Sequence, residues 1–140
     1  MKRRLAILTV VALSVACSGA LNAPDPRNEL PFGVVDLPKA GSTVSRSTFV
    51  SGWAMDDSRV RAVRVYIDGK YVTEARMGLV PRPDVSKTYP KYAHRSDAHG
   101  WGVQVDFGNL TGAHVVLAQA VDDRNATRDL GAVSVNVRPQ

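Results

Sequence analysis

Short segments in which apolar and polar residues alternate one by one recur between residue 63 and residue 137 of this chain. Residues 63–67 read VRVYI, residues 101–107 read WGVQVDF and residues 133–137 read VSVNV. Successive side chains of a β-strand point to opposite faces of a sheet, so this period of two marks strands with one buried face. A chain with this pattern is expected to build its core from sheets.

Further strands are predicted between turn signals that recur at short intervals. These strands cover residues 33–37, 48–55, 71–77 and 114–121. Asp68-Gly69 supplies the positive φ angles of a tight hairpin between two of the strands. About seven short strands with turns between them, and no convincing amphipathic helix, predict an all-β fold, an antiparallel β-sandwich.

The N-terminus has the composition of an export signal. Lys2, Arg3 and Arg4 precede an uncharged apolar stretch over residues 5–16. That stretch is shorter than the roughly 20 residues that a spanning helix needs. We therefore expect residues 1–20 to be a signal peptide and the protein to be exported.

Cys17 is the only cysteine, and it follows Leu13-Ser14-Val15-Ala16, which resembles the bacterial lipobox. This context predicts lipidation of Cys17 and a membrane-anchored lipoprotein of the cell envelope. The alternative is cleavage after Ala20 by an ordinary signal peptidase, which would give a secreted or periplasmic protein. In either case no intramolecular disulfide can form, so the fold must rely on its core.

The charge of the mature chain is small. The chain has 18 basic and 13 acidic residues, and three of the basic residues lie in the leader, which leaves a net charge of +2. This balance gives no indication of nucleic-acid binding. Residues 21–32 contain three prolines and are expected to be a tether, followed by one domain over residues 33–138.

Five stretches carry a family resemblance: GWAMDDSRVRAVRVYIDGKYV, GLVPRPDV, YPKY, GWGVQVDFGNLTGAH and AVDDRNAT. In this order they resemble the bacterial Ig-like domains of exported and surface proteins. The resemblance implies that the predicted sandwich is immunoglobulin-like, with about seven strands, and that its role is non-catalytic, as is usual for these domains. The chain departs from the family pattern at Arg59 and near Ala126, where glycine is common, and at Trp101, where the family has phenylalanine.

The strand order predicts that three loops meet at one pole of the sandwich. They are the turn at residues 56–59, the long segment at 78–99 and the turn at 122–127. Loops at one end of such a sandwich often carry binding residues. The candidate binding residues are Asp56, Asp57, Arg82, Asp84, Tyr89, Asp122, Asp123 and Asn125.

Two interpretations of these acidic residues remain open. Asp56, Asp84 and Asp123 could supply oxygen ligands to a calcium ion, because Ca²⁺ prefers six to eight oxygens. Alternatively, the aspartates cap turns and pair with arginines, and Arg82-Pro83-Asp84 staples the long segment to the sandwich. In that second interpretation, Tyr89, Tyr92 and Trp101 pack beneath the segment.

Two other classes of site were considered. His94, Asp97 and His99 offer metal ligands within one short loop, as a metal-dependent hydrolase would need, but no general base accompanies them. Trp53, Tyr66, Tyr71, Tyr89 and Tyr92 could instead contact a glycan or a protein, with Tyr66 expected to be the most exposed. The sequence thus predicts a non-catalytic envelope module with no cofactor, unless it binds Ca²⁺. Its expected partner is an envelope protein or glycan, with a membrane contact through Cys17.

Overall fold

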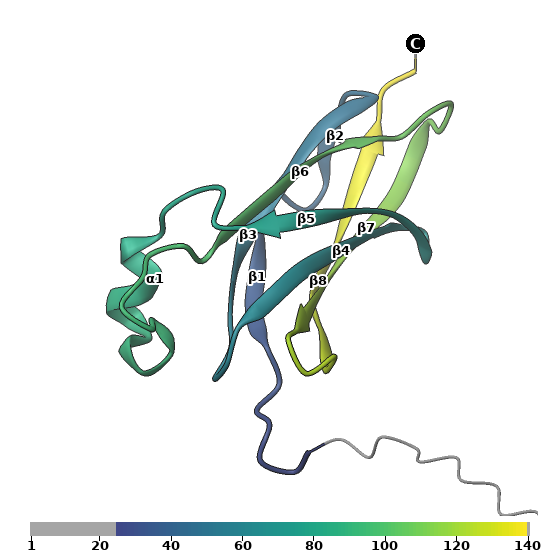
Figure 1. Ribbon diagram of the computed structural model, residues 1–140. Coiled ribbons are helices and arrows are strands. Elements are labelled where there is room, and N and C mark those ends of the chain that lie inside the picture. Colours follow the sequence, from purple (N-terminus) through teal and green to yellow (C-terminus); the bar gives the residue numbers. More distant parts are fainter. Residues whose placement is uncertain (1–24, 140) are drawn as a thin grey trace, which may run out of the picture.

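The computed structural model describes residues 25–139, so Cys17 and the expected leader lie outside that range. The fold is all-β, as predicted (Figure 1). Its strands are β1 (Phe32–Leu37), β2 (Ser42–Val44), β3 (Ser47–Met55), β4 (Val60–Ile67), β5 (Lys70–Met77), β6 (Gly100–Asp106), β7 (Gly112–Asp122) and β8 (Thr127–Val137). Every strand expected from the alternation is present, and β2 is an additional one. The part of the chain that the structure describes contains no helix long and apolar enough to cross a bilayer.

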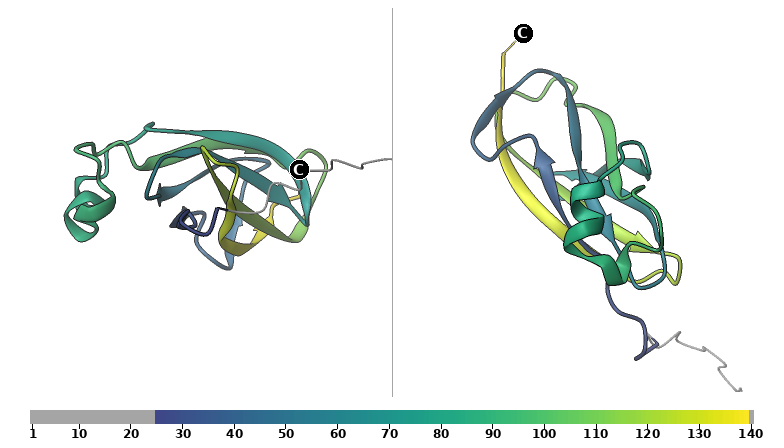
Figure 2. Two further views of the ribbon diagram at one scale, coloured as in Figure 1. Left: turned by 60° about the horizontal axis from the view of Figure 1, so that its bottom comes forward. Right: turned by 90° about the vertical axis from the view of Figure 1, so that its left-hand side faces the viewer.

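The strands form one continuous, curled sheet in the order β1-β3-β6-β5-β4-β7-β8-β2. Pairing is antiparallel except between β2 and β8, which run parallel. Strands β5 and β6 share only the pairs Arg76–Gly102 and Met77–Trp101, so the sheet folds over at this narrow junction. Strand β1 thereby comes to lie against β8, and the two halves enclose the core as in a sandwich (Figure 2).

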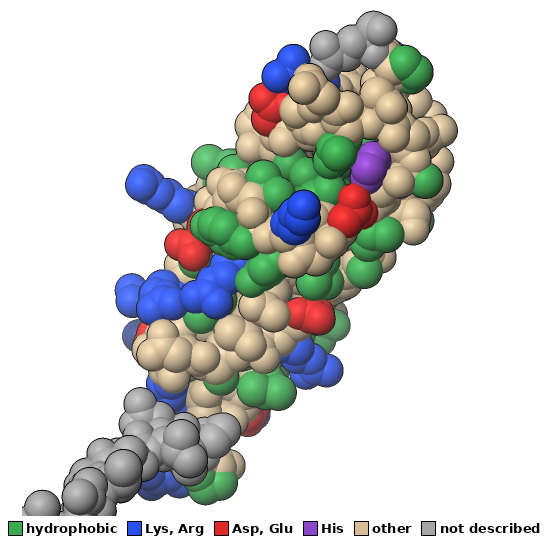
Figure 3. All heavy atoms as spheres, turned by 90° about the vertical axis from the view of Figure 1, so that its right-hand side faces the viewer, with side chains coloured by type: hydrophobic (Ala, Val, Ile, Leu, Met, Phe, Trp, Pro, Cys, Tyr) green, Lys and Arg blue, Asp and Glu red, His purple; other side chains and the backbone are tan. Residues whose placement is uncertain are grey.

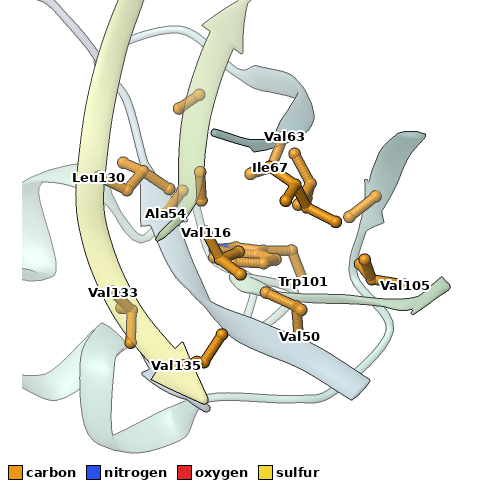
Figure 4. Close-up of a cluster of buried hydrophobic side chains, with 14 of the residues drawn as sticks. Val50, Ala54, Val63, Ile67, Trp101, Val105, Val116, Leu130, Val133 and Val135 are labelled. Atoms are coloured by element: carbon orange, nitrogen blue, oxygen red, sulfur yellow. The ribbon is translucent and has the colours of Figure 1, made fainter. Parts of the chain in front are cut away.

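The core is built mainly from small β-branched side chains around one large aromatic ring. Trp101 on β6 is fully buried and is surrounded by valines such as Val50 and Val116 (Figure 4). The inward residues of β4 and β8 complete the cluster. Trp101 was expected beneath the long segment, but it belongs to the centre of the domain. The alternation of β6 directs its ring inward, between the two halves of the sheet.

The long segment between β5 and β6 is ordered by two short helices, α1 (Pro83–Thr88) and η1 (Pro90–Tyr92), which the sequence did not predict. Both begin with a proline, whose fixed φ suits the first helical position. Only Val85 of α1 is buried, so the helix has no periodic apolar face that a sequence pattern could reveal. Figures 1 and 2 show α1 lying to the side of the sheet.

The end of the domain away from α1 carries an ion pair in the Asp68-Gly69 hairpin between β4 and β5 (Figure 1). His114 Nδ1 lies 2.6 Å from Asp68 Oδ2, and the backbone N–H of Val115 donates to Asp68 Oδ1 over 2.9 Å. A shallow hollow nearby is lined by Tyr71, Val72 and Leu110. Figure 3 shows hydrophobic side chains beside charged ones on the face farthest from α1.

The hairpin pair predicts a pH-dependent term in stability. The hydrogen bond to Asp68 raises the pKa of His114 above 6.5. The stabilisation is therefore complete below the unfolded pKa of about 6.5 and is lost as pH rises through the folded value. We expect the difference in urea midpoint between the wild type and His114→Gln to be larger at about pH 5.5 than at about pH 8.5. Equal differences at both pH values would contradict this.

Candidate functional site

The structure brings the three predicted loops to one end of the domain, called here the loop pole: residues 56–59, 78–99 and 123–126. The backbone N–H of Asp123 donates to the carbonyl of Arg59 over 3.0 Å, which joins the first and last loops. His94 Nε2 lies 3.0 Å from the carbonyl oxygen of Asp56, which joins the first loop to the long segment. In Figure 1 the two turns lie at the lower end, where the chain enters β1.

Asp122 and its neighbours serve the turn before β8. Asp122 is fully buried, and its Oδ1 accepts from the backbone N–H groups of Arg124 (2.9 Å) and Ala126 (2.7 Å). Its Oδ2 accepts from the Asn28 side chain over 2.6 Å, which holds the N-terminal segment against the turn. Asn125 has a φ of 67° and accepts from Arg61. These contacts fit the turn-capping interpretation.

Asp57 pairs with an arginine of the turn before β8. Its Oδ2 lies 3.4 Å from the Arg124 guanidinium, which also donates to Asn28 Oδ1 over 2.6 Å. The positive charge of Arg124 therefore sits among the acidic side chains of both turns. This arrangement joins the two turns through an ion pair.

Asp56, Ser58 and Asp123 form a compact polar cluster. The Ser58 hydroxyl lies 2.6 Å from Asp56 Oδ2 and 2.7 Å from Asp123 Oδ1. A hydroxyl has one proton and can donate to only one of these oxygens at a time. Burial raises the pKa of the Asp56 carboxyl, although the hydrogen bonds from Ser58 act in the opposite direction.

Arg82 staples the long segment to the sandwich. Its guanidinium donates to both oxygens of Asp84, over 2.9 and 2.7 Å, and to Asp36 Oδ2 of β1 over 2.7 Å. The pKa of Asp84 is lowered to about 2, chiefly by the hydrogen bond from Arg82. Arg82 directly precedes α1, and Asp36 belongs to the edge strand β1. This bridge therefore fixes α1 to that edge of the sheet.

Arg82→Ala is expected to loosen α1 while leaving the sandwich folded. Both carboxylate partners are substantially exposed, so the loss in free energy of unfolding should be only about 1 kcal/mol. Hydrogen exchange at the amides of Val85 and Ser86, which donate to the Arg82 carbonyl, should accelerate selectively. Lys87→Ala, in the same helix, is the matched control. Unchanged exchange in Arg82→Ala would refute the staple.

Aromatic rings provide the second attachment of the long segment. Phe32 of β1 contacts Tyr89 and Tyr92, with ring centroids 5.2 and 4.9 Å apart, and Trp53 of β3 lies 5.5 Å from Tyr89. The Tyr92 hydroxyl also donates to Glu29 over 2.6 Å. Thus Tyr89 and Tyr92 do pack beneath the segment as expected, but their partners are Phe32 and Trp53, with Trp101 elsewhere.

The structure corrects the expectation that Tyr66 is the most exposed aromatic residue. Tyr66 is only partly accessible, because β4 lies between β5 and β7 and its ring packs on Tyr71 at 5.9 Å. Its hydroxyl reaches Gln119 Oε1 at 3.4 Å. Tyr71, on β5, is 58% exposed.

The proposed calcium ligands are not assembled into one site. Asp84 is held by Arg82, whereas Asp56 and Asp123 share Ser58. Within residues 25–139 no three His, Cys, Asp or Glu side chains are grouped so that they could hold a metal ion. The same holds for His94, Asp97 and His99, since His94 bonds the Asp56 carbonyl and His99 bonds the Ser96 carbonyl.

Calcium is therefore expected to have no effect on the melting temperature. The chain should melt within about 1 °C of the same temperature in EDTA and in millimolar Ca²⁺. An increase of roughly 10 °C, as expected for a ligand at a hundred times its dissociation constant, would contradict this.

A cavity of about 330 Å³ lies at the loop pole, between the end of β3 and the long segment. Its walls are largely apolar and include Met55, Val60 and Met77, while Asp56, His94 and His99 contribute polar groups. Neither this cavity nor the role of Ser58 was predicted from the sequence. The consecutive Asp56-Asp57-Ser58 was a turn signal, but nothing in it indicated which oxygen would be buried.

Comparison with known proteins gives a family match and several distant structural similarities. Residues 31–80 match the bacterial Ig domain family, which confirms the expected resemblance. No curated protein matches the chain.

Three solved structures resemble the chain at low identity. Fibronectin(III)-like modules of CbhA from Clostridium thermocellum share 15% identity, with a TM-score of 0.49 over 79% of this chain and 47% of theirs. CopC from Methylosinus trichosporium OB3b shares 16%, with a TM-score of 0.42 over 77% of this chain and 95% of its own. The SrpA adhesin from Streptococcus sanguinis shares 10%, with a TM-score of 0.44 over 80% of this chain and 60% of its own. This chain thus spans about half the length of the CbhA structure.

Proposed function

With residues 31–80 matching the bacterial Ig domain family, we propose that this chain is an exported, non-catalytic binding module of the bacterial cell envelope. Bacterial Ig domains are typically non-catalytic. The observation that carries the proposal is the loop pole, where an ordered segment over residues 78–99 is fixed to the sandwich and leaves a cavity beside it. Binding surfaces commonly consist of loops that a rigid scaffold holds in place.

The segment over residues 78–99 is attached to the sandwich at two places. Arg82 bridges the segment to β1, and the Phe32 ring packs against Tyr89 and Tyr92. A segment of this length that only joined β5 to β6 would not need both attachments, because short connections suffice between neighbouring strands. Preorganisation of this kind reduces the entropy lost when a partner binds.

A new arginine at each end of the domain tests whether the loop pole is the contact surface. Ala98 is exposed at the loop pole, where it lines the cavity, and Val72 is exposed near the opposite hairpin. We expect Ala98→Arg to reduce retention of the labelled mature protein on isolated cell envelopes by about fivefold or more, and Val72→Arg to leave retention unchanged. Equal retention of both variants would place the contact elsewhere. No retention of the wild type would overturn the binding role.

The membrane anchor is a separate part of the proposal and has its own test. It rests on the lipobox-like sequence before Cys17. We expect the wild type to incorporate a labelled fatty acid and to enter the detergent phase of a phase-separation assay, and Cys17→Ser to do neither. If the wild type remained in the aqueous phase without label, cleavage after Ala20 would replace lipidation as the explanation of the leader.

A further inference from the structure

The cavity at the loop pole contains a buried carboxylate with one oxygen that has no partner. Asp56 is 2% exposed and is one of the residues that line the cavity. Its Oδ2 accepts from the backbone N–H of Ser58 over 2.9 Å and also contacts the Ser58 hydroxyl. Its Oδ1 is buried without a hydrogen bond to any described group. An unpaired buried acceptor of this kind destabilises the folded state, and a donor that filled the cavity would offset that cost.

The other polar groups of the lining also offer acceptors. His94 Nε2 and His99 Nε2 each lie against a backbone carbonyl, at 3.0 and 2.7 Å. A carbonyl can only accept, so both Nε2 atoms carry the proton and, in the neutral ring, each Nδ1 is left as an acceptor. The cavity therefore combines apolar walls with a lining that is rich in acceptors.

Further negative charge surrounds Asp56. Asp57 and Asp122 lie close enough to contribute to the raised pKa of Asp56, although burial is the main cause. Arg124 is bound to Asp57 and Asn28 and offsets part of this charge. The attraction for a positively charged occupant therefore comes chiefly from Asp56.

We propose that this cavity binds a primary ammonium group carried on a short aliphatic chain. The inference rests on the proposed binding role of the loop pole, and it names the chemical class of the ligand. An ammonium has three N–H donors, one of which would satisfy Asp56 Oδ1. The aliphatic chain would lie along Met55, Val60 and Met77, and a volume of about 330 Å³ has room for it.

Other cations fit the cavity less well. A guanidinium binds carboxylates best through two parallel hydrogen bonds, but only one oxygen of Asp56 is free because Ser58 occupies the other. A quaternary ammonium has no N–H donor and prefers a cage of aromatic rings, whereas Tyr92 is the one aromatic residue in the lining. Arg59 also lines the cavity, but it is exposed and can turn toward solvent.

Titration with butylammonium chloride tests the proposal on the mature protein. The methyl resonances of Met55 and Met77 should shift and saturate, with a dissociation constant of roughly 10 mM or below. 1-Butanol has the same chain without the charge and should bind at least about tenfold more weakly. Nα-acetyl-lysine methylamide should bind at least as well as butylammonium if the natural source is a lysine side chain, and more weakly if it is a free amine.

Asp56→Asn keeps the size of the side chain and removes the charge. It should weaken butylammonium binding at least about tenfold, whereas Asp97→Asn, outside the lining, should leave it unchanged. The proposal is overturned if butylammonium gives no saturable shift, if 1-butanol binds as well, or if Asp56→Asn binds normally. The 1-butanol comparison uses the wild type and decides the matter even if Asp56→Asn does not fold. If Ala98→Arg lost envelope retention but the wild type bound no ammonium, only this inference would be refuted. If the wild type showed neither envelope retention nor ammonium binding, the binding role would be refuted too.

Discussion

Replacement of Trp101 by alanine is expected to lower the free energy of unfolding by about 3–5 kcal/mol. The ring is fully buried at the centre of the core and packs against side chains from both halves of the sheet (Figure 4). Its Nε1 has no hydrogen-bond partner among the described residues, so the loss comes from apolar packing and the cavity left behind. A single domain is stabilised by only about 5–15 kcal/mol, and this substitution would remove a large part of that.

Urea denaturation of two further variants checks the interpretation. Trp101→Phe retains an aromatic ring and removes the unpaired N–H, so it should cost less than half as much as Trp101→Ala. Tyr71→Ala removes a comparable ring that is 58% exposed and should cost about 1 kcal/mol or less. If Trp101→Ala and Tyr71→Ala were equally destabilised, Trp101 would not be the centre of the core.

Gly52→Ala is expected to destabilise the domain by about 3 kcal/mol or more, although it adds one methyl group. A Cβ at Gly52 would lie 1.9 Å from the carbonyl oxygen of Val34 and 2.9 Å from Cζ2 of Trp101. The first of these atoms belongs to the backbone of β1, so relief of the clash requires β1 to move away from β3. That movement would also displace Asp36, which holds Arg82 and with it α1.

Gly102→Ala is the matched control in the neighbouring strand. A Cβ there would approach the end of the Phe49 ring at 2.5 Å, but Phe49 is 42% exposed and can rotate away. The expected cost is about 1 kcal/mol. The urea midpoints of both variants, together with hydrogen exchange in α1, measure these effects. A loss in Gly102→Ala as large as in Gly52→Ala would show that backbone clash is not the cause.

The sequence was informative where structure repeats with a short period. Strands such as β4, β6 and β8 bury alternate residues, so their positions could be predicted from the order of apolar and polar side chains. Strand β2 has only three residues and α1 buries only Val85, so neither leaves a pattern that can be recognised. Both are held by tertiary contacts, which no local sequence signal encodes.

The candidate site could also be predicted only in part. The strand order sufficed to predict that the three loops meet, because each strand reverses the direction of the chain. It could not show that Asp84 pairs with Arg82 while Asp56 turns inward beside Ser58. The choice between a cation site, a staple and a cavity depends on side-chain rotamers, and the aspartates look alike in the sequence.

The contacts of the N-terminal segment determine which end of the domain lies nearest to an anchor at Cys17. Asn28 bonds Asp122 and Glu29 bonds Lys91 and Tyr92, so the chain leaves the domain at the loop pole itself. Eight covalent steps separate Cys17 from Asp25, and a fully extended chain covers at most roughly 3.5 Å per step. With Cys17 acylated, the loop pole would therefore be the end of the domain nearest the anchor, and Asp25 would lie within about 30 Å of the bilayer surface. Any ligand would then be met in the thin layer next to the lipid headgroups, and long structures farther out would contact the opposite hairpin first.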